Sequence, residues 1–251
     1  MLFNYHTHTK RCGHAVGEDR EYVESAIQAG LKTLGFADHA YIYPDKNFET
    51  NCAMKKARIF DYAQSVRALA KEYANDIRIL LGFEVEYYPD FHEEQRAFLN
   101  QVSPDYLILG QHCSGNGMEK PYMLNITSPD LLGEYITQII AGLATGDFLY
   151  VAHPDLPGWN MPKERVEREY RRLCEYAKKK NIPLEFNFLG FSTNRCYPSR
   201  EFFQIASEVG NKVIFGVDAH DPVSFLNKET EQKALEVIKE LNLQLVDKPL
   251  I

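Results

Sequence analysis

Short apolar segments alternate with helical segments along this chain, and this alternation limits the possible folds more than any other feature. The apolar segments are rich in β-branched and aromatic residues and carry few polar positions. Such segments are typical of strands that are covered on both faces in a parallel sheet. The seven segments span residues 2–6, 33–38, 77–84, 105–112, 148–153, 183–188 and 212–218.

The segments between the expected strands have the periodicity and residue types of helices. Several begin with a capping residue, such as Ser128 or Ser199, and Gly30 and Gly210 follow two of the last helical turns. Strict alternation of strand and helix predicts an α/β fold with parallel strands, either open and doubly wound or closed into a barrel. The expected helices span 18–30, 52–75, 91–102, 128–145, 162–180, 199–209 and 229–241.

Length and composition fit one α/β domain over residues 1–251. The net charge of −7 argues against nucleic acid as a partner, because neutralising phosphates requires clustered Lys and Arg. No apolar run is long enough to span a bilayer and the start does not resemble a signal peptide, so we expect a cytoplasmic protein without a membrane partner. The five cysteines contain no CxxC pair, which fits reduced thiols, and we assign Cys113 to packing. The sequence sets no oligomeric state.

Ionisable side chains stand at the ends of six of the seven expected strands. In a parallel barrel these ends meet at one rim, where the active sites of such folds lie. His6 and His8 are spaced i, i+2, so an extended strand turns both side chains to one face. The strand-end set is His6, His8, His39, Glu84, His112, His153, Asp218 and His220, and His14 lies in the first loop.

These nine residues exceed what one metal ion uses, since zinc takes three or four protein ligands. The pattern therefore predicts a cluster of two or three divalent cations. A single histidine at a strand end is more often a hydrogen-bonded core residue, and we assign a structural role to His92 at a helix start. Of the two carboxylates in the third strand region, we expect Glu84 rather than Glu86 to face the cluster, because the apolar run stops at Glu84.

Taken together, these motifs resemble the PHP superfamily, named for its polymerase and histidinol-phosphatase members. The resemblance rests on HTHT, CGHAVGEDREYVESAIQAGLKTLGFADHA, GFE, GQH, AHPD and FGVDAH, and it runs from residue 3 to about 222. It is closest to the histidinol-phosphatase branch, where stretches similar to LGFEVEYYPDF and NRCYPSREFFQIASEVGNKVIFGVDAH occur. The resemblance implies a distorted, TIM-like (β/α)7 barrel that holds a trinuclear metal centre.

The resemblance also divides the ligands among the metal ions, with Glu84 bridging the first two. Imidazole and carboxylate ligands suit zinc, iron, manganese or cobalt, and we expect zinc or manganese. Asp38 and Asp155 each lie near a ligand in sequence and are candidates to orient imidazoles, although Asp38 could equally be a cap. The first ion would take His6, His8, Glu84 and Asp218, the second Glu84, His112 and His153, and the third His14, His39 and His220.

Clustered divalent ions lower the pKa of bound water and hold the attacking and leaving oxygens in phosphoryl transfer. We therefore expect hydrolysis of a small phosphate monoester, and the resemblance implies L-histidinol phosphate. Arg195, just beyond the sixth strand, is the expected phosphate ligand. His14 and Asp155 are candidates for the acid that protonates the leaving group. The branch commonly has a basic residue soon after HPD, whereas HPDLPGWNMP carries Trp159, which would either wall the pocket against a ring-bearing substrate or pack the loop.

Three alternatives stay open at this point. The same chemistry could act on a sugar, nucleotide or phosphotyrosyl ester. An amidohydrolase-type enzyme that cleaves C–N bonds on a similar barrel would use one or two metals, usually with a lysine-derived bridge, yet no expected strand ends in Lys. The third alternative is a metal-binding or regulatory protein without catalytic activity.

Overall fold

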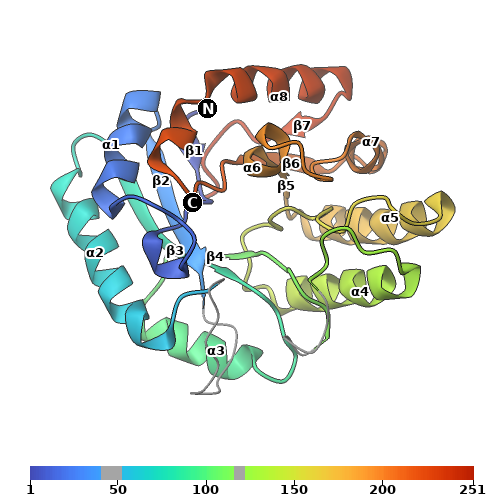
Figure 1. Ribbon diagram of the computed structural model, residues 1–251, viewed down its shortest axis with the longest axis horizontal. Coiled ribbons are helices and arrows are strands. Elements are labelled where there is room, and N and C mark those ends of the chain that lie inside the picture. Colours follow the sequence, from blue (N-terminus) through green and yellow to red (C-terminus); the bar gives the residue numbers. More distant parts are fainter. Residues whose placement is uncertain (41–52, 116–121) are drawn as a thin grey trace.

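The computed structural model describes residues 1–40, 53–115 and 122–251 (Figure 1). Strands lie at the centre, and helices from all parts of the chain surround them (Figure 1). The strands are β1 Phe3–Asn4, β2 Thr33–His39, β3 Arg78–Val85, β4 Tyr106–Leu109, β5 Leu184–Asn187, β6 Lys212–Gly216 and β7 Gln244–Leu245.

Most of the expected helices form close to their expected bounds. Ser128 and Ser199 cap α4 and α7, each through a side-chain oxygen that accepts from a backbone N–H, while Gly30 and Gly210 end α1 and α7 in the left-handed conformation. The α-helices are α1 Asp19–Ala29, α2 Ile59–Glu72, α3 His92–Leu99, α4 Pro129–Thr145, α5 Lys163–Lys180, α6 Phe188–Ser192, α7 Arg200–Val209 and α8 Lys228–Glu240. Short 3-10 turns are η1 Lys10–Cys12, η2 Lys56–Arg58, η3 Asn100–Val102 and η4 Pro222–Leu226.

The strands pair in parallel in the orders β1-β2-β3-β4 and β5-β6-β7. Val151 lies between the two groups and makes parallel bridges to Leu109 of β4 and Leu184 of β5. On the other side, Thr7 pairs with Ala219 and so joins the continuation of β1 to that of β6. The sheet therefore curls into the distorted parallel barrel that the sequence predicts.

The fifth expected strand, 148–153, is shorter than predicted. Its backbone bonds to both neighbours, but regular pairing is confined to the bridges at Val151. His153 has a positive φ of 30° and begins a run of tight turns, in which the N–H of Leu156 donates to the carbonyl of His153. These turns end the extended conformation directly below the rim.

Two elements were not expected from the sequence. Helix α6 directly follows β5, and β7 pairs with Lys212 and Val213 at the start of β6. The apolar pattern of β7 is too short to be recognised by periodicity.

The helix expected over 52–75 begins at Ile59, and residue 52 lies outside the described residues. That residues 1–251 form one domain stays a prediction.

Two apolar cores stabilise the barrel. The larger core lies between the strands and the helices, and the smaller fills the barrel interior with Tyr5, Tyr106 and Tyr150 among its members. The hydroxyl of Tyr106 donates to the carbonyls of Tyr5 and Phe36, so its burial leaves no unpaired donor. The interior below the rim is thus a packed core, and the polar residues gather above it.

The C-terminal tail covers the end of the barrel opposite the rim. The N–H of Leu250 donates to the hydroxyl of Tyr5 at 2.9 Å, and Nη1 of Arg78 donates to the carbonyl of Ile251 at 2.8 Å. Leu250 also packs against the interior core.

Within the described residues, no helix is both long and apolar enough to cross a membrane.

Candidate metal centre

The carboxyl ends of the strands bring all nine predicted ligands to one side of the barrel. The register of β2 and β3 pairs His39 with Glu84, and both residues lie where these strands approach the rim. The remaining ligands come from the segments that follow strands or turns: His6 and His8 after β1, His14 after η1, His112 after β4, His153 after Val151, and Asp218 and His220 after β6.

The two i, i+2 pairs face the same space, as their spacing predicts. The ring centroids of His6 and His8 are 5.0 Å apart. Nε2 of His8 lies 3.0 Å from Oδ1 of Asp218, and Nδ1 of His220 lies 3.3 Å from the same oxygen. Side chains separated by more than two hundred residues in the chain therefore meet at one point.

Glu84 is the centre of the cluster, and its carboxylate has five imidazole nitrogens within 4 Å. The shortest of these separations are 2.7 Å to Nδ1 of His39 and 2.8 Å to Nε2 of His153. Glu86 lies instead 3.5 Å from Nδ1 of His112, and the choice of Glu84 as the ligand stays a prediction. The other separations are 3.6 Å to His6, 3.7 Å to His8 and 3.9 Å to His112.

A second group of imidazoles lies nearer to solvent. Ligand nitrogens of His8, His39 and His220 lie within 4.8 Å of one another. Nε2 of His14 is 2.9 Å from Nε2 of His220, and the two rings stack at 4.6 Å. The sulfur of Cys12, which the sequence did not identify as a ligand, also lies within 4.8 Å of ligand nitrogens of His14 and His220. These contacts bring together the ligands expected for a third ion.

Several buried ligand atoms lack the partner that burial demands. Nε2 of His6, both ring nitrogens of His8 and Oε2 of Glu84 make no well-oriented hydrogen bond within the described part of the chain, although Oε2 of Glu84 and Nε2 of His8 each have an ionisable neighbour within 3.0 Å. A buried polar group without a partner costs free energy, so unpaired atoms that converge on one space need an explanation. Imidazole nitrogens and carboxylate oxygens are donors that divalent transition metals accept, so the residues fit metal ions.

Glu185 holds His6 in place, and the sequence did not reveal it. Its Oε1 accepts from Nδ1 of His6 at 2.8 Å, while its Oε2 accepts from the backbone N–H of His153 at 2.9 Å and from Nδ2 of Asn187 at 2.9 Å. The signal was a carboxylate inside the apolar strand β5 with Asn187 two residues on. Such a contact fixes the tautomer and orientation of a ligating histidine.

Asp38 and Glu86 each place a carboxylate close to the imidazole of a proposed ligand. Oδ1 of Asp38 is 3.5 Å from Nδ1 of His8, and its other oxygen accepts from the hydroxyl of Thr9. Oε1 of Glu86 lies 3.5 Å from Nδ1 of His112, whose backbone N–H donates to Oε2 of Glu86 at 3.2 Å. Their positions suit the orientation of His8 and His112.

Two residues of the cluster have a strained backbone conformation. His153 and Asp218 have φ values of 30° and 53°, in a region that residues other than glycine seldom adopt. Such conformations persist where the surrounding structure enforces them, and they cluster at functional sites. The strain turns both side chains towards Glu84 and His6.

The protonation states at the cluster follow from burial and charge. Burial opposes ionisation of Glu84, but His39, His6 and His112 outweigh it and hold the pKa of Glu84 well below its usual value. Burial lowers the pKa of His39 and of His220 to about 3, so both rings are neutral near pH 7. Ionised carboxylates and neutral imidazoles are the forms that bind cations.

His112 differs from these two rings. Burial lowers its pKa, but Glu84 and Glu86 outweigh burial and raise the pKa of His112 to about 9. Cation binding at this ring would therefore release a proton near neutral pH.

Arg195 lies beside the cluster on an exposed turn after α6. Its Nη1 donates to the hydroxyl of Tyr197 at 2.8 Å, and the Tyr197 ring packs edge-on against His153 at 5.8 Å. Partial burial lowers the pKa of the Arg195 guanidinium, but Tyr197, Asp218 and Tyr122 outweigh it and raise that pKa. Tyr197 and Tyr122 were not recognised from the sequence.

Asp155 and Trp159 meet at Ser199 instead of at the ligands. Oδ2 of Asp155 accepts from the backbone N–H and the hydroxyl of Ser199, at 2.6 and 2.8 Å, and Nε1 of Trp159 donates to the same hydroxyl at 2.7 Å. Burial raises the pKa of Asp155 to about 7. The Trp159 ring packs on Tyr170 at 5.5 Å, which supports the loop-packing alternative.

His92 lies away from the ligands, as expected from its place at a helix start. It is buried at the beginning of α3, and its Nε2 lies 2.7 Å from Oδ2 of Asp147.

The strand-end cluster gains its family context from one comparison. The family model described as PHP domain matches residues 4–188, which include seven of the nine proposed ligands; only Asp218 and His220 lie beyond the match. The chain belongs to the PHP domain family. The PHP resemblance read from the sequence motifs is thereby confirmed.

Relatives of this PHP protein share most of its length. A probable histidinol-phosphatase from Deinococcus radiodurans is 27% identical over 228 residues, which cover 88% of this chain and 87% of that protein. The crystal structure of a putative histidinol phosphatase from Listeria monocytogenes has a TM-score of 0.72 at 22% identity and covers 91% of this chain and 99% of that one.

A further structure with the same fold is histidinol phosphate phosphatase from Lactococcus lactis, described as complexed with zinc, L-histidinol and phosphate. Its TM-score is 0.73 at 18% identity, and the match covers 98% of this chain and 95% of that one. At these identities the two structural matches establish the shared barrel fold.

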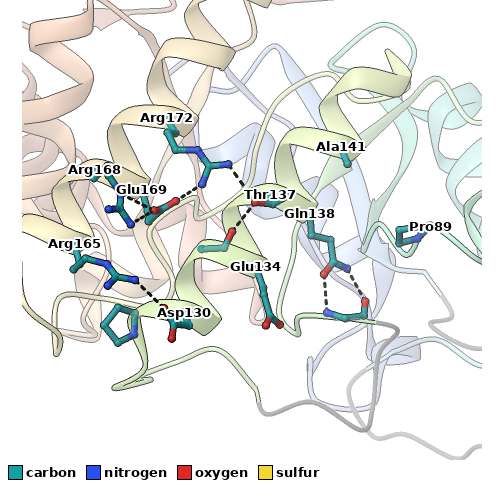
Figure 2. A pocket seen from close by; sticks show the side chains of 13 residues that line it. Pro89, Asp130, Glu134, Thr137, Gln138, Ala141, Arg165, Arg168, Glu169 and Arg172 are labelled. Atoms are coloured by element: carbon teal, nitrogen blue, oxygen red, sulfur yellow. Dashed lines mark hydrogen bonds and ion pairs between the residues drawn. The ribbon is translucent and has the colours of Figure 1, made fainter.

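A separate cavity of about 730 Å³ lies between α4 and α5 of the PHP barrel (Figure 2). Its arginines are paired with carboxylates: Arg165 binds Asp130 at 2.7 Å, and Arg168 and Arg172 both bind the buried Glu169 (Figure 2). None of the nine proposed ligands lines this cavity. The Arg165–Asp130 pair links α5 to α4, whereas the two pairs with Glu169 lie within α5, and the metal centre lies elsewhere.

Proposed function

We propose that this protein is a metal-dependent phosphatase that hydrolyses a small phosphate monoester, with L-histidinol phosphate as the best single candidate. The observation that carries the proposal is the carboxylate of Glu84 with five imidazoles around it. A bridging carboxylate surrounded by imidazoles suits a cluster of two or three zinc, manganese or iron ions.

The nine strand-end and loop ligands would hold these ions, divided as the family resemblance implies. Bound ions would lower the pKa of water and stabilise the charge that develops on the phosphoryl oxygens. The ligands need fixed orientations for this chemistry. Glu185 supplies one by accepting from Nδ1 of His6, which leaves the buried Nε2 of that ring directed at Glu84 and Asp218.

Arg195 would bind the phosphate group of the substrate. Guanidinium groups recognise phosphate through paired hydrogen bonds, and Arg195 is exposed beside the cluster while its contact with Tyr197 limits its range. The positive charge of Arg195 and of the ions would offset the overall acidity of the chain at this point.

The proton for the leaving group is assigned to His14 or Asp155, and both assignments stay predictions. His14 is exposed at the mouth, whereas Asp155 is fully buried with one oxygen bonded to Ser199. These positions favour His14 as the group that reaches a leaving alcohol. Trp159 as a wall of the substrate site also stays a prediction, as does a cytoplasmic location.

The names of the relatives support histidinol phosphate as the substrate, because the Deinococcus, Listeria and Lactococcus proteins are all described as histidinol phosphatases. The loop after His153 lacks the basic residue common in that branch, so the substrate requires a direct test. Steady-state rates of metal-loaded protein on histidinol phosphate, sugar phosphates, nucleoside monophosphates and phosphotyrosine provide it.

The highest kcat/KM is expected for histidinol phosphate. A clear preference for another monoester would support phosphatase activity but contradict histidinol phosphate as the substrate. Metal-loaded protein that hydrolyses no ester in this panel would contradict the proposed function, and release of ammonia or an amine from an amide or amidine panel would favour the amidohydrolase alternative.

A further inference from the structure

Tyr122 presents an exposed ring at the mouth of the metal centre. One face of the ring lies parallel to His112, with centroids 5.8 Å apart and an angle of 11° between the planes. The side chain is nevertheless 50% exposed, although large aromatic rings are usually buried. The ring therefore lies against a proposed ligand and still keeps half of its surface exposed.

The backbone fixes Tyr122 in this position. Tyr122 pairs with Cys113 in an antiparallel bridge, and the N–H of the next residue, Met123, donates to the carbonyl of His112 at 2.8 Å. These bonds tie the segment that starts at Tyr122 to the segment that carries His112. The ring is thus held in place before any substrate binds, which lowers the entropy cost of stacking on it.

Tyr122 and Arg195 lie beside the same part of the metal centre. Arg195 donates to the hydroxyl of Tyr197, whose ring packs against His153. The rings of His153 and His112 are 4.8 Å apart, and Tyr122 stacks on His112, so Arg195 and Tyr122 lie beside neighbouring proposed ligands. A monoester whose phosphate contacted Arg195 and the cluster would place its alcohol part beside the Tyr122 ring.

We propose that the outer face of the Tyr122 ring stacks on a planar group in the alcohol part of the substrate, so that the centre selects ring-bearing phosphate monoesters. This inference rests on the proposed function. It accounts for an exposed aromatic ring directly beside a buried polar cluster. The imidazole of histidinol phosphate belongs to the predicted class, whereas simple aliphatic phosphates do not.

Binding of two non-hydrolysable analogues tests the inference without depending on turnover. Titration calorimetry of metal-loaded protein would compare benzylphosphonate, which has a ring, with ethylphosphonate, which has none. Wild type is expected to bind benzylphosphonate about two- to tenfold more tightly, the range that an aromatic pair supplies. Tyr122→Leu should abolish that preference while Tyr122→Phe keeps it.

Each outcome has a distinct meaning. A preference that survives in Tyr122→Leu, or no preference in wild type, would overturn the role of Tyr122 and leave the phosphatase proposal intact. Failure of wild type to bind either phosphonate would overturn both proposals. Tyr176→Leu, on α5, is the matched control and should bind like wild type. Equal metal content in all variants would show that the comparison concerns the ring alone.

Discussion

Gly110 gives Glu84 the space that its carboxylate occupies. A Cβ on Gly110 would lie 1.8 Å from Oε1 of Glu84 and 2.4 Å from its Cδ. Gly216 has the same relationship to Glu185, with a Cβ 1.8 Å from Oε1. The two buried carboxylates beside the imidazoles thus each depend on a glycine, one directly after β4 and one at the end of β6.

Gly110→Ala is expected to damage the metal centre. The added methyl group must displace Glu84, because a contact under 3 Å cannot persist. Overpacking of this kind typically costs about 1–3 kcal/mol of unfolding free energy. We expect loss of bound metal together with this loss of stability, measured by elemental analysis and urea unfolding on the same preparation.

Gly133→Ala is the matched control. Gly133 lies inside α4, and its added Cβ would come no closer than 3.8 Å to Glu169. Because alanine favours helix over glycine by roughly 1 kcal/mol, this variant should keep its metal and lose no stability. Normal metal content in Gly110→Ala would contradict the role given to Glu84.

Glu185→Gln is expected to weaken metal binding about 10- to 100-fold, the usual effect of losing a partner that orients a ligand. Oε2 of Glu185 accepts from two donors, the N–H of His153 and Nδ2 of Asn187, and an amide NH₂ cannot accept both. Competition with a chromogenic chelator measures the change. Exposed Glu175→Gln on α5 should leave the affinity unchanged. Equal metal affinities in the two variants would contradict the role of Glu185 in orienting His6.

Arg195→Ala is expected to lower kcat/KM for a phosphate monoester by roughly 10- to 100-fold, since hydrogen bonds to charged groups contribute about 1.5–3 kcal/mol. The melting temperature should stay close to that of wild type because the side chain is exposed. Arg195→Lys should recover part of the loss, as it keeps the charge but not the paired geometry. An unchanged kcat/KM in Arg195→Ala would place the phosphate elsewhere.

That the proposed ligands lie close together could be predicted because a parallel barrel brings the carboxyl ends of its strands to one rim. His39 and Glu84 illustrate this, since each ends or nearly ends an apolar run and the register pairs them directly. The i, i+2 spacing also told which face His6 and His8 share. Local sequence patterns were sufficient here because the end of a strand can be recognised from the place where its apolar run stops.

Contacts between distant parts of the chain could not be predicted in this way. Glu185 meets His6 across 179 residues, and only the closure of the barrel determines that contact. Tyr122 looks like any loop residue until its backbone bridge to Cys113 is known. Trp159 was ambiguous for the same reason, because its packing on Tyr170 depends on how the loop meets α5.

Asp147→Asn is expected to lower stability in a pH-dependent way. Burial works against the Asp147 carboxylate, but His92 and Arg96 outweigh it and hold the pKa of Asp147 below its usual value. A lowered carboxylate pKa stabilises the fold above the unfolded-state pKa of about 4, and this stability is lost as the pH falls through the folded-state pKa. The variant should lose about 1 kcal/mol or less at pH 7.

Urea unfolding at several pH values between about 7 and 3 measures this difference. The gap between wild type and Asp147→Asn should close towards the acid end. Asp247→Asn, an exposed position in the C-terminal tail, serves as the control and should show no such trend. A gap of constant size across the range would show that the carboxylate charge contributes nothing.

The most direct test of the metal centre is anomalous X-ray diffraction from crystals of protein purified without chelators, recorded at the zinc, iron and manganese edges. Peaks between the Glu84 carboxylate and the rings of His6, His8, His39, His112 and His153 are the result predicted here. Imidazoles that bond only to one another, to carboxylates or to water, with no anomalous peak among them, would contradict it.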